Sequence, residues 1–269
     1  MHFSTIIAQF SIRLLIALSL GLATTACYSQ HKTTTTTTIV DSEIDAVKGA
    51  TLLKRAVAAH GGAAYETAHY QFVFRGNTYT FQNQKDNYTY TKNQTKDGKT
   101  IIDKMDNKNF VRMVDGTPEE MTDKQVSGYK EGLNSVIYFA TLPHKLLDKA
   151  VNPEFQGVQS IKGQDYDIIK VTFDKKGGGK DYEDTFLYWI NRKTSTMDFL
   201  AYSYKVNGGG VRFRTAYNTR TVDGIVFQDY VNYKATKTTS LFDLPALWVA
   251  NDLKELSRIE TEEVKNMNY

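Results

Sequence analysis

The sequence contains a single cysteine, Cys27, so the chain cannot form an internal disulfide. The serine-nucleophile motif G-x-S-x-G is missing, and so are the H-E-x-x-H and C-x-x-C spacings of metal and redox sites. Neither glycine triplet precedes a predicted helix, as a phosphate-binding loop would. These absences leave no recognisable catalytic residue, and they predict neither a cofactor nor a bound metal.

An excess of charge of one sign is also lacking. The 33 lysines and arginines nearly balance the 30 aspartates and glutamates, and the formal net charge is +3. The basic residues do not gather into a stripe that would fit a nucleic-acid groove, so nucleic acid is not an expected partner. Hydrophobic residues make up 41% of the chain, as in an ordinary globular domain.

Residues 1–26 have the layout of a secretory signal peptide. Arg13 is the only charged side chain there, an apolar run follows at 14–23, and small residues end the segment. The apolar run is shorter than the roughly 20 residues of a membrane-spanning helix, although a retained N-terminal anchor is an alternative. Cys27 follows directly, where it resembles the lipid-modified first residue of a bacterial lipoprotein; the alternative is a chance thiol near a signal-peptidase site.

We therefore expect three parts: a signal peptide at 1–26, a lipidated threonine-rich tether at 27–43, and one half-barrel domain at 44–269. The tether contains six consecutive threonines at 33–38 and little that a core could bury. A domain anchored through Cys27 would be exported and would lie in the periplasm or at the cell surface. We expect the outer membrane to hold the anchor.

The domain is predicted to be mainly β with some helix (α+β). Apolar spacing predicts an N-terminal helix at 44–60 and two short helices between 123 and 141, interrupted near Gly128 or Gly132. About eleven strands are expected, because aromatic and β-branched residues alternate between turn signals. No βαβ alternation occurs, so we expect a curved antiparallel sheet that forms an incomplete barrel. Residues 255–264 are assigned to a final strand, with a helix as the alternative.

The strand expected at 184–190 is apolar on both sides. Successive side chains of a strand point in opposite directions, so Phe186 and Tyr188 share one side while Leu187 and Trp189 share the other. Helices can cover one face of such a sheet. The other face either closes around an apolar cavity or packs as a plain sandwich core. Tyrosines at alternating strand positions suit the rim of such a cavity, because a tyrosine has an apolar body and a polar tip, and they suit the exterior of a barrel equally.

The segments at 53–62, 177–190 and 201–217 resemble a family of bacterial lipoproteins of unknown function. This family is similar in architecture to the lipoprotein-carrier and sorting fold of the periplasm, and the resemblance spans residues 46–264. It implies an incomplete antiparallel barrel around helices, with an apolar cavity for acyl chains or other hydrophobic ligands. It transfers no catalytic motif.

A ligand site is predicted in the cup of the curved sheet. The expected lining residues are Phe186, Tyr188, Trp189, Tyr202 and Phe213. The expected polar rim consists of Asp181, Asp184, Arg212 and Arg214, which combine carboxylates with guanidinium groups suited to bidentate pairing. The alternative for this polar group is a solvated turn with surface ion pairs of about 1 kcal/mol or less.

The leading hypothesis is a membrane-anchored envelope lipoprotein that binds a hydrophobic or amphipathic, lipid-like ligand such as an acyl chain. One alternative is an envelope hydrolase in which the acidic turn acts with His60 or His144. Another is a scaffold lipoprotein that only contacts other proteins. His60 ends the first predicted helix, where an imidazole more simply caps the helix.

Overall fold

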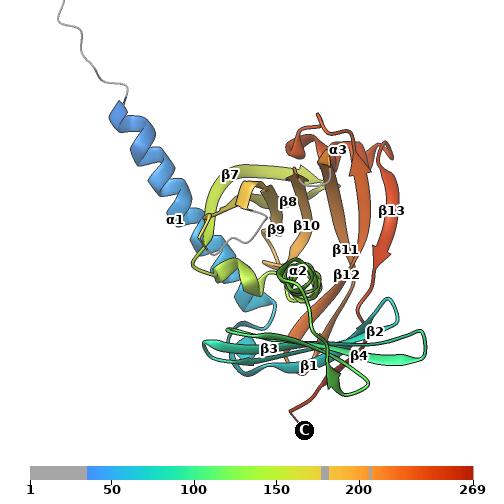
Figure 1. The fold of residues 1–269 in the computed structure, drawn as a ribbon. Helices are drawn as coiled ribbons and strands as arrows, with labels where there is room; N and C mark the ends of the chain where they lie inside the picture. The colour runs from blue at the N-terminus through green and yellow to red at the C-terminus, as the bar shows by residue number, and fades with distance from the viewer. Residues whose placement is uncertain (1–34, 177–181, 206–207, 269) are drawn as a thin grey trace, which may run out of the picture.

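A computed structural model describes residues 35–176, 182–205 and 208–268 of the chain. The described residues form two seven-stranded antiparallel sheets and three α-helices. Sheet B, which contains β7 to β13, curves like an open barrel. Sheet A, which contains β1 to β6 and β14, lies across one end of it (Figure 1). The expected mainly β architecture, with an N-terminal helix and a helical insertion, is confirmed.

Consecutive strands pair almost throughout, because tight turns connect antiparallel neighbours. Sheet A has the order β14-β1-β2-β3-β4-β5-β6, with bounds β1 His69–Phe74, β2 Asn77–Gln84, β3 Asn87–Lys96, β4 Lys99–Asp106, β5 Phe110–Val114, β6 Thr117–Pro118 and β14 Glu262–Asn266. Sheet B has the order β13-β12-β11-β10-β9-β8-β7, with bounds β7 Val151–Ile161, β8 Gln164–Phe173, β9 Thr185–Asn191, β10 Met197–Tyr204, β11 Gly210–Val222, β12 Ile225–Ala235 and β13 Lys254–Ile259.

The described chain has more strands than the eleven or so expected from alternation. One reason is β6, an edge strand of two residues that is too short to show a period. The other is that residues 254–266 form two strands instead of one. β13 completes sheet B and β14 pairs with β1 of sheet A, so this segment joins the two sheets.

Helix α1 (Thr35–Ala59) begins earlier than residue 44, inside the segment expected to be a tether. Once a helix is nucleated, each further residue adds a hydrogen bond at small cost, so even residues of low helix propensity such as threonine can extend it. The helix packs against β7 so closely that a Cβ on Gly49 would lie 3.0 Å from the backbone nitrogen of Glu154. This contact explains a glycine inside the helix. The N-terminal end of α1 projects away from both sheets (Figure 1).

Helix α2 (Asp123–Ala140) is one continuous helix, so the prediction of two short helices is wrong. Thr122 and Gln125 form a capping box that satisfies the first amide groups. The glycines that suggested an interruption cost the helix only about 1 kcal/mol each relative to alanine. Burial of Leu133 and Ile137 against sheet A outweighs that cost.

Both sides of β9 are buried, as predicted. Phe186 and Tyr188 belong to a core on the concave face of sheet B, which α1 and residues 142–146 cover. Leu187 and Trp189 belong to a second core on the convex face. The segment around α3 (Leu244–Val249) covers this convex core, so neither flank of β9 meets bulk solvent.

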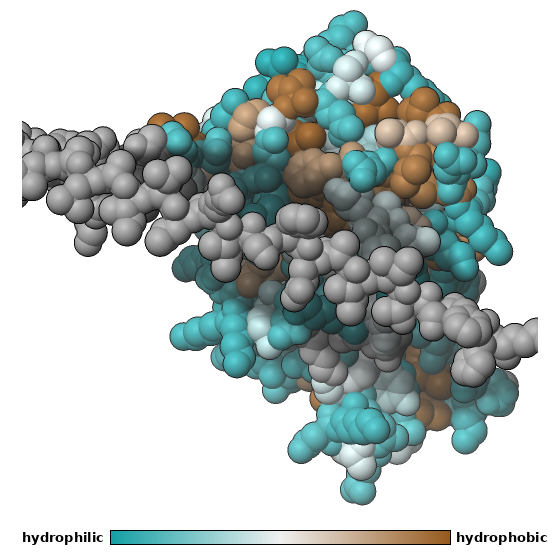
Figure 2. Space-filling view, turned by 90° about the horizontal axis from the view of Figure 1, so that it is seen from above, coloured by the Kyte–Doolittle hydropathy of each residue, from teal (hydrophilic) through white to brown (hydrophobic). Residues whose placement is uncertain are grey.

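A third core holds the two sheets together. It combines the inner face of sheet A with Leu133 and Ile137 of α2 and with Ile225 and Phe227, where the hairpin of β11 and β12 reaches sheet A. No helix in the described ranges has the length and apolar character needed to cross a bilayer. From the end that carries α3, hydrophobic residues form small groups between hydrophilic ones (Figure 2).

Candidate ligand-binding site

The protein's own side chains fill only part of the concave face of sheet B. Over β8, β9 and β10 the space is occupied by Leu52, Leu53 and Ala56 of α1 and by Leu142 and Leu146. Over β10 to β13, helix α2 covers the sheet and leaves a pocket of about 330 Å³. Pockets of about 300–1,000 Å³ hold small-molecule ligands, so this pocket is at the small end of that range.

The pocket wall is divided almost evenly between apolar or aromatic residues and polar residues. Its apolar lining residues are Phe72, Phe74, Val136, Phe139, Ala140, Tyr202, Tyr230 and Ile259. Its polar lining residues are Arg75, Ser135, Arg214, Gln228, Asn232, Ser257 and Thr261. The only charged side chains in this lining are the two arginines, so an acidic group entering the pocket would meet no carboxylate on its wall.

Strand register brings the polar residues together on one side of the pocket. Leu200 of β10 lies opposite Arg214 of β11, Arg214 lies opposite Asn232 of β12, and Asn232 lies opposite Ser257 of β13. Directly opposed residues point to the same face of a sheet. Along this row the concave face changes from apolar on β10 to polar on β11 to β13, while Tyr230 and Ile259 keep the neighbouring row apolar.

Arg214 is the most unusual group of the pocket, because its side chain is buried and incompletely hydrogen-bonded. The residue is 7% exposed. Its Nη2 donates to the hydroxyl of Tyr202 at 3.1 Å, and its Cζ lies 4.0 Å from the centroid of the Phe139 ring. Its Nε and Nη1 have no hydrogen-bond partner. A buried cation without a counter-charge is costly, so this group points to a role beyond packing.

The polar rim expected from the sequence is brought together only in part. Arg212 donates to the hydroxyl of Tyr204 and to the carbonyl oxygen of Val211. Asp184 is buried at the start of β9, and Glu183 beside it forms an ion pair of 3.6 Å with Lys205. Asp181 lies outside the described residues, as does Cys27.

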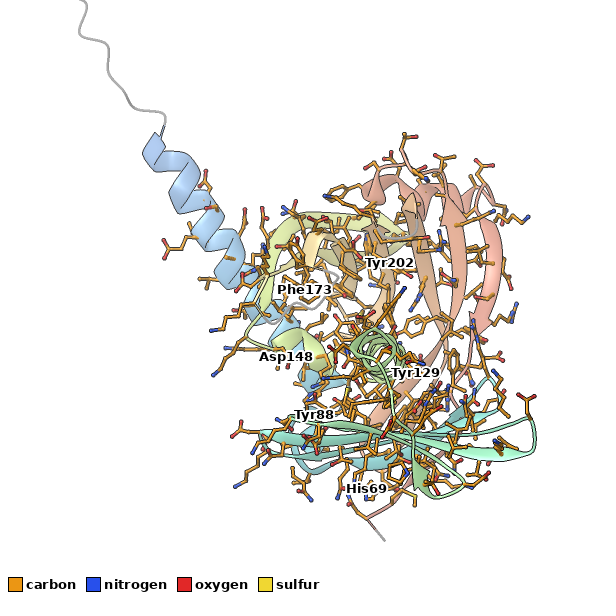
Figure 3. The ribbon with its side chains drawn as sticks, in the orientation of Figure 1. His69, Tyr88, Tyr129, Asp148, Phe173 and Tyr202 are labelled. Atoms are coloured by element: carbon orange, nitrogen blue, oxygen red, sulfur yellow. The ribbon has the colours of Figure 1, made fainter. Side chains whose placement is uncertain are left out.

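The five expected lining residues divide between the two faces of sheet B. Tyr202 lines the pocket, and Phe186 and Tyr188 lie beside it in the concave core, where Phe186 stacks on Tyr202. Figure 3 shows Tyr202 and Phe173 on the side of the sheet that faces α2. Trp189 and Phe213 lie on the convex face against α3, so they cannot contact the same ligand.

Sequence reasoning missed the lining residues that come from other elements. Phe72 and Phe74 belong to sheet A, and Phe139 belongs to α2. Their apolar alternation and helical spacing predicted burial, but no local signal showed that these elements meet over β10 to β13. Ile259 was missed because the sequence left open whether residues 255–264 form a strand or a helix.

The sequence of the chain matches a known family over most of its length. Residues 56–263 match the model of the family of unknown function DUF6503. The chain belongs to this family. The expected membership of a family of unknown function is therefore confirmed. No curated protein matches this chain.

The fold of this DUF6503 protein resembles a LolA superfamily protein from Nitrosomonas europaea, with 11% identity over 82% of this chain and 94% of that chain and a TM-score of 0.48. It also resembles a domain named as an outer membrane lipoprotein-sorting protein from Vibrio parahaemolyticus, with 10% identity over 83% and 94% of the two chains and a TM-score of 0.46. Lipoprotein LppX of Mycobacterium tuberculosis matches at 11% identity over 61% and 90%, with a TM-score of 0.29. Similarity at this level says nothing of what this protein binds.

The two histidines considered for hydrolysis lie in packed surroundings away from the pocket lining of this DUF6503 protein. Nε2 of His60 accepts a hydrogen bond from the backbone N–H of Met197 at 3.1 Å, so His60 joins the end of α1 to β10. His144 stacks on Tyr65 with ring centroids 4.4 Å apart. Burial lowers the pKa of each imidazole to about 4. Among the described residues, no group of three His, Cys, Asp or Glu could hold a metal ion.

The buried state of His60 predicts a loss of stability in mild acid. Its pKa is about 4 in the folded protein and about 6.5 in the unfolded chain, so the unfolded chain takes up the proton first as the pH falls. The contribution to stability is therefore complete above about pH 6.5 and is lost as the pH falls toward 4. We expect His60 to account for about 2–3 kcal/mol of the stability lost between pH 7.5 and pH 4.5.

Urea unfolding of the wild type and of His60→Gln at these two pH values measures this contribution. Glutamine keeps an acceptor for the Met197 amide but does not titrate, so the variant should lose about 2–3 kcal/mol less than the wild type on acidification. Equal losses in both proteins would show that other groups cause the acid sensitivity.

Proposed function

We propose that this DUF6503 protein is an exported envelope lipoprotein that binds a hydrophobic or amphipathic, lipid-like ligand between α2 and the concave face of sheet B. The observation that carries the proposal is the pocket of about 330 Å³, which the core side chains leave open. Its wall combines aromatic and aliphatic side chains with converging polar groups, which suits a ligand that has both an apolar and a polar part.

The same proposal places a lipid anchor on Cys27, held by the outer membrane, with the domain in the periplasm or at the cell surface. The signal-like segment at 1–26 and the position of Cys27 directly after it support this arrangement. The N-terminal end of α1 supports it as well, because it projects away from both sheets (Figure 1). The exported Cys27→Ala chain should accordingly be recovered in the soluble fraction, and it is the protein to use for ligand binding.

Titration of this Cys27→Ala chain with the neutral fluorescent probe N-phenyl-1-naphthylamine tests the pocket. Ser135 lines the pocket from α2 and is exposed, so Ser135→Trp should fill the space without disturbing the core. We expect saturable binding to the unsubstituted pocket and at least tenfold weaker binding to Ser135→Trp, since a loss of about 1.4 kcal/mol gives a factor of ten.

Asn134→Trp is the matched control. Asn134 is the neighbouring exposed residue of α2 and does not line the pocket, so this variant should bind the probe as the unsubstituted protein does. Mass spectrometry of lipids extracted from the purified protein would then identify a bound natural ligand. Absence of saturable binding, or equal weakening by both tryptophans, would contradict a ligand site in this pocket.

A further inference from the structure

We propose that the ligand is a single-chain amphiphile with an anionic head group, a carboxylate or a phosphate, and that Arg214 binds this head group. The proposal rests on the proposed function, because it specifies the ligand class of the same pocket. It depends on three observations: the free donors of Arg214, the acid-free lining of the pocket, and a row of basic residues beside Arg214.

The first observation is that two of the three nitrogens of the Arg214 guanidinium group have no hydrogen-bond partner. Only Nη2 has a partner, the neutral hydroxyl of Tyr202, while Nε and Nη1 are buried without one. A guanidinium group presents its N–H donors as a planar fork that fits a carboxylate or phosphate with two parallel hydrogen bonds. The ring of Phe139 lies over this fork at 4.0 Å. A head group would therefore reach it by displacing Phe139, which comes from α2 and is only half-buried.

The second observation is that the acids next to lining residues in the chain, Asp229 and Glu260, are already bound elsewhere. Asp229 accepts hydrogen bonds from Asn218, Arg220 and Thr261, and Glu260 accepts one from Tyr217. The lining itself contributes Arg75 and Arg214 but no Asp or Glu. Arg75 is exposed, whereas Arg214 is buried, and in surroundings of low dielectric constant an unneutralised cation favours an anion over a neutral group of the same shape.

The third observation is the row of residues next to Arg214 on the concave face. Arg212 of β11 lies opposite Lys234 of β12, and Lys234 lies opposite Lys254 of β13. No acidic residue in the described ranges forms an ion pair with any of these three. Basic residues aligned on one face attract anions to the site, so this row provides a positive approach to Arg214.

The volume of the pocket limits the apolar part of the ligand. At about 330 Å³ it is at the small end for a ligand pocket and is suited to one acyl chain, not to the two chains of a phospholipid. The chain would lie along Phe72, Phe74 and Ile259, and the head group would lie against Arg214.

Displacement of N-phenyl-1-naphthylamine from the Cys27→Ala chain tests the proposal with three competitors of one chain length: laurate, dodecyl phosphate and dodecanol. At least one anionic competitor should bind tenfold or more tightly than dodecanol, because a hydrogen bond to a charged group contributes at least the 1.4 kcal/mol of a tenfold change. Whichever of laurate and dodecyl phosphate binds more tightly identifies the anion as carboxylate or phosphate.

Arg214→Met should abolish this preference while dodecanol binds as before, and Arg214→Lys should restore part of it. Arg258→Met is the control, since Arg258 is an exposed arginine of the same sheet that pairs with Glu255. Equal binding of all three competitors would overturn the head-group assignment and leave the proposed function standing. If none of the three competitors bound, both the head-group assignment and the proposed function would be overturned. A loss of dodecanol binding in Arg214→Met, with a lower free energy of unfolding, would assign Arg214 to packing and overturn the inference.

Discussion

Replacing Trp189 with alanine is expected to lower the free energy of unfolding by about 3–5 kcal/mol, the usual cost of removing a buried tryptophan. The side chain is completely buried in the convex core of sheet B. Its indole Nε1 donates to Oε1 of Gln159 at 2.7 Å, and its ring meets Phe213 edge to face. The substitution therefore leaves a cavity and a polar group without its partner. Urea or guanidinium denaturation measures the loss.

Trp248→Ala is the matched control for this prediction. Trp248 belongs to the same convex core but is only half-buried, beneath Lys162. Trp248→Ala should lower the free energy of unfolding by less than half as much as Trp189→Ala, since the loss depends on the apolar area that the side chain buries. A loss in Trp189→Ala no larger than about 1 kcal/mol, as for an exposed substitution, would mean that the segment around α3 does not close the convex face. Because Trp189 faces away from α2, a folded Trp189→Ala protein should bind N-phenyl-1-naphthylamine as the unsubstituted protein does.

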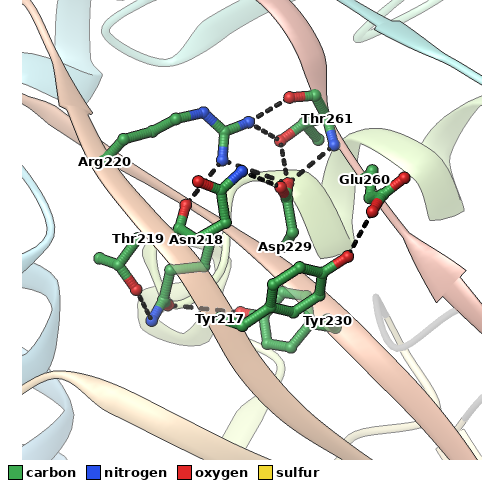
Figure 4. A network of polar contacts seen from close by, with 9 residues as sticks. Tyr217, Asn218, Thr219, Arg220, Asp229, Tyr230, Glu260 and Thr261 are labelled. Carbon is green, nitrogen blue, oxygen red and sulfur yellow. Dashed lines mark hydrogen bonds and ion pairs between the residues drawn. The ribbon is translucent and has the colours of Figure 1, made fainter.

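Asp229→Ala is expected to cost about 3–5 kcal/mol, because it breaks a buried ion pair and leaves its partners without an acceptor. Asp229 is 3% exposed and accepts hydrogen bonds from Asn218, Arg220 and the backbone N–H and hydroxyl of Thr261. Arg220 also donates to the carbonyl oxygen of Thr261. Figure 4 shows how these contacts tie β11 and β12 to the connection between β13 and β14.

The loss of stability in Asp229→Ala should not be confined to the contacts of Asp229, because the connection between β13 and β14 joins sheet B to sheet A. Glu255→Ala removes the carboxylate of the exposed Arg258–Glu255 pair in the same sheet and should cost less than about 1 kcal/mol. Denaturation of both variants compares the buried and the exposed pair under the same conditions. A small loss in Asp229→Ala would show that other contacts hold the crossover in place.

Periodicity in the sequence predicted the main features of sheet B. The double-sided pattern of β9 predicted that both Phe186 and Trp189 would be buried, and the structure confirms it. The absence of βαβ alternation predicted antiparallel pairing, which all the paired strands show. These features depend on neighbours in the chain, and such local preferences are visible in a single sequence.

The candidate site was predicted less completely because it depends on contacts between distant segments. Arg214 and Tyr202 were among the residues expected at the site, and both line the pocket. Trp189 and Phe213 were grouped with them, but the sequence could not show that the segment at 241–253 would cover the opposite face. Interruption of α2 at its glycines was a wrong prediction, since tertiary packing of Leu133 and Ile137 overrides a weak local preference.

The amino-acid sequence by itself determined which strands pair in succession and which side chains of one strand share a face, because both follow from alternation and turn residues close together in the chain. The tertiary structure alone decided which helix covers which face. α1 fills the concave face over β8 to β10, while α2 leaves space over β10 to β13, where Arg214 keeps unused donors. The physical reason is that a pattern of apolar residues requires burial but does not specify the partner, and the partner emerges only when all the surfaces pack at once.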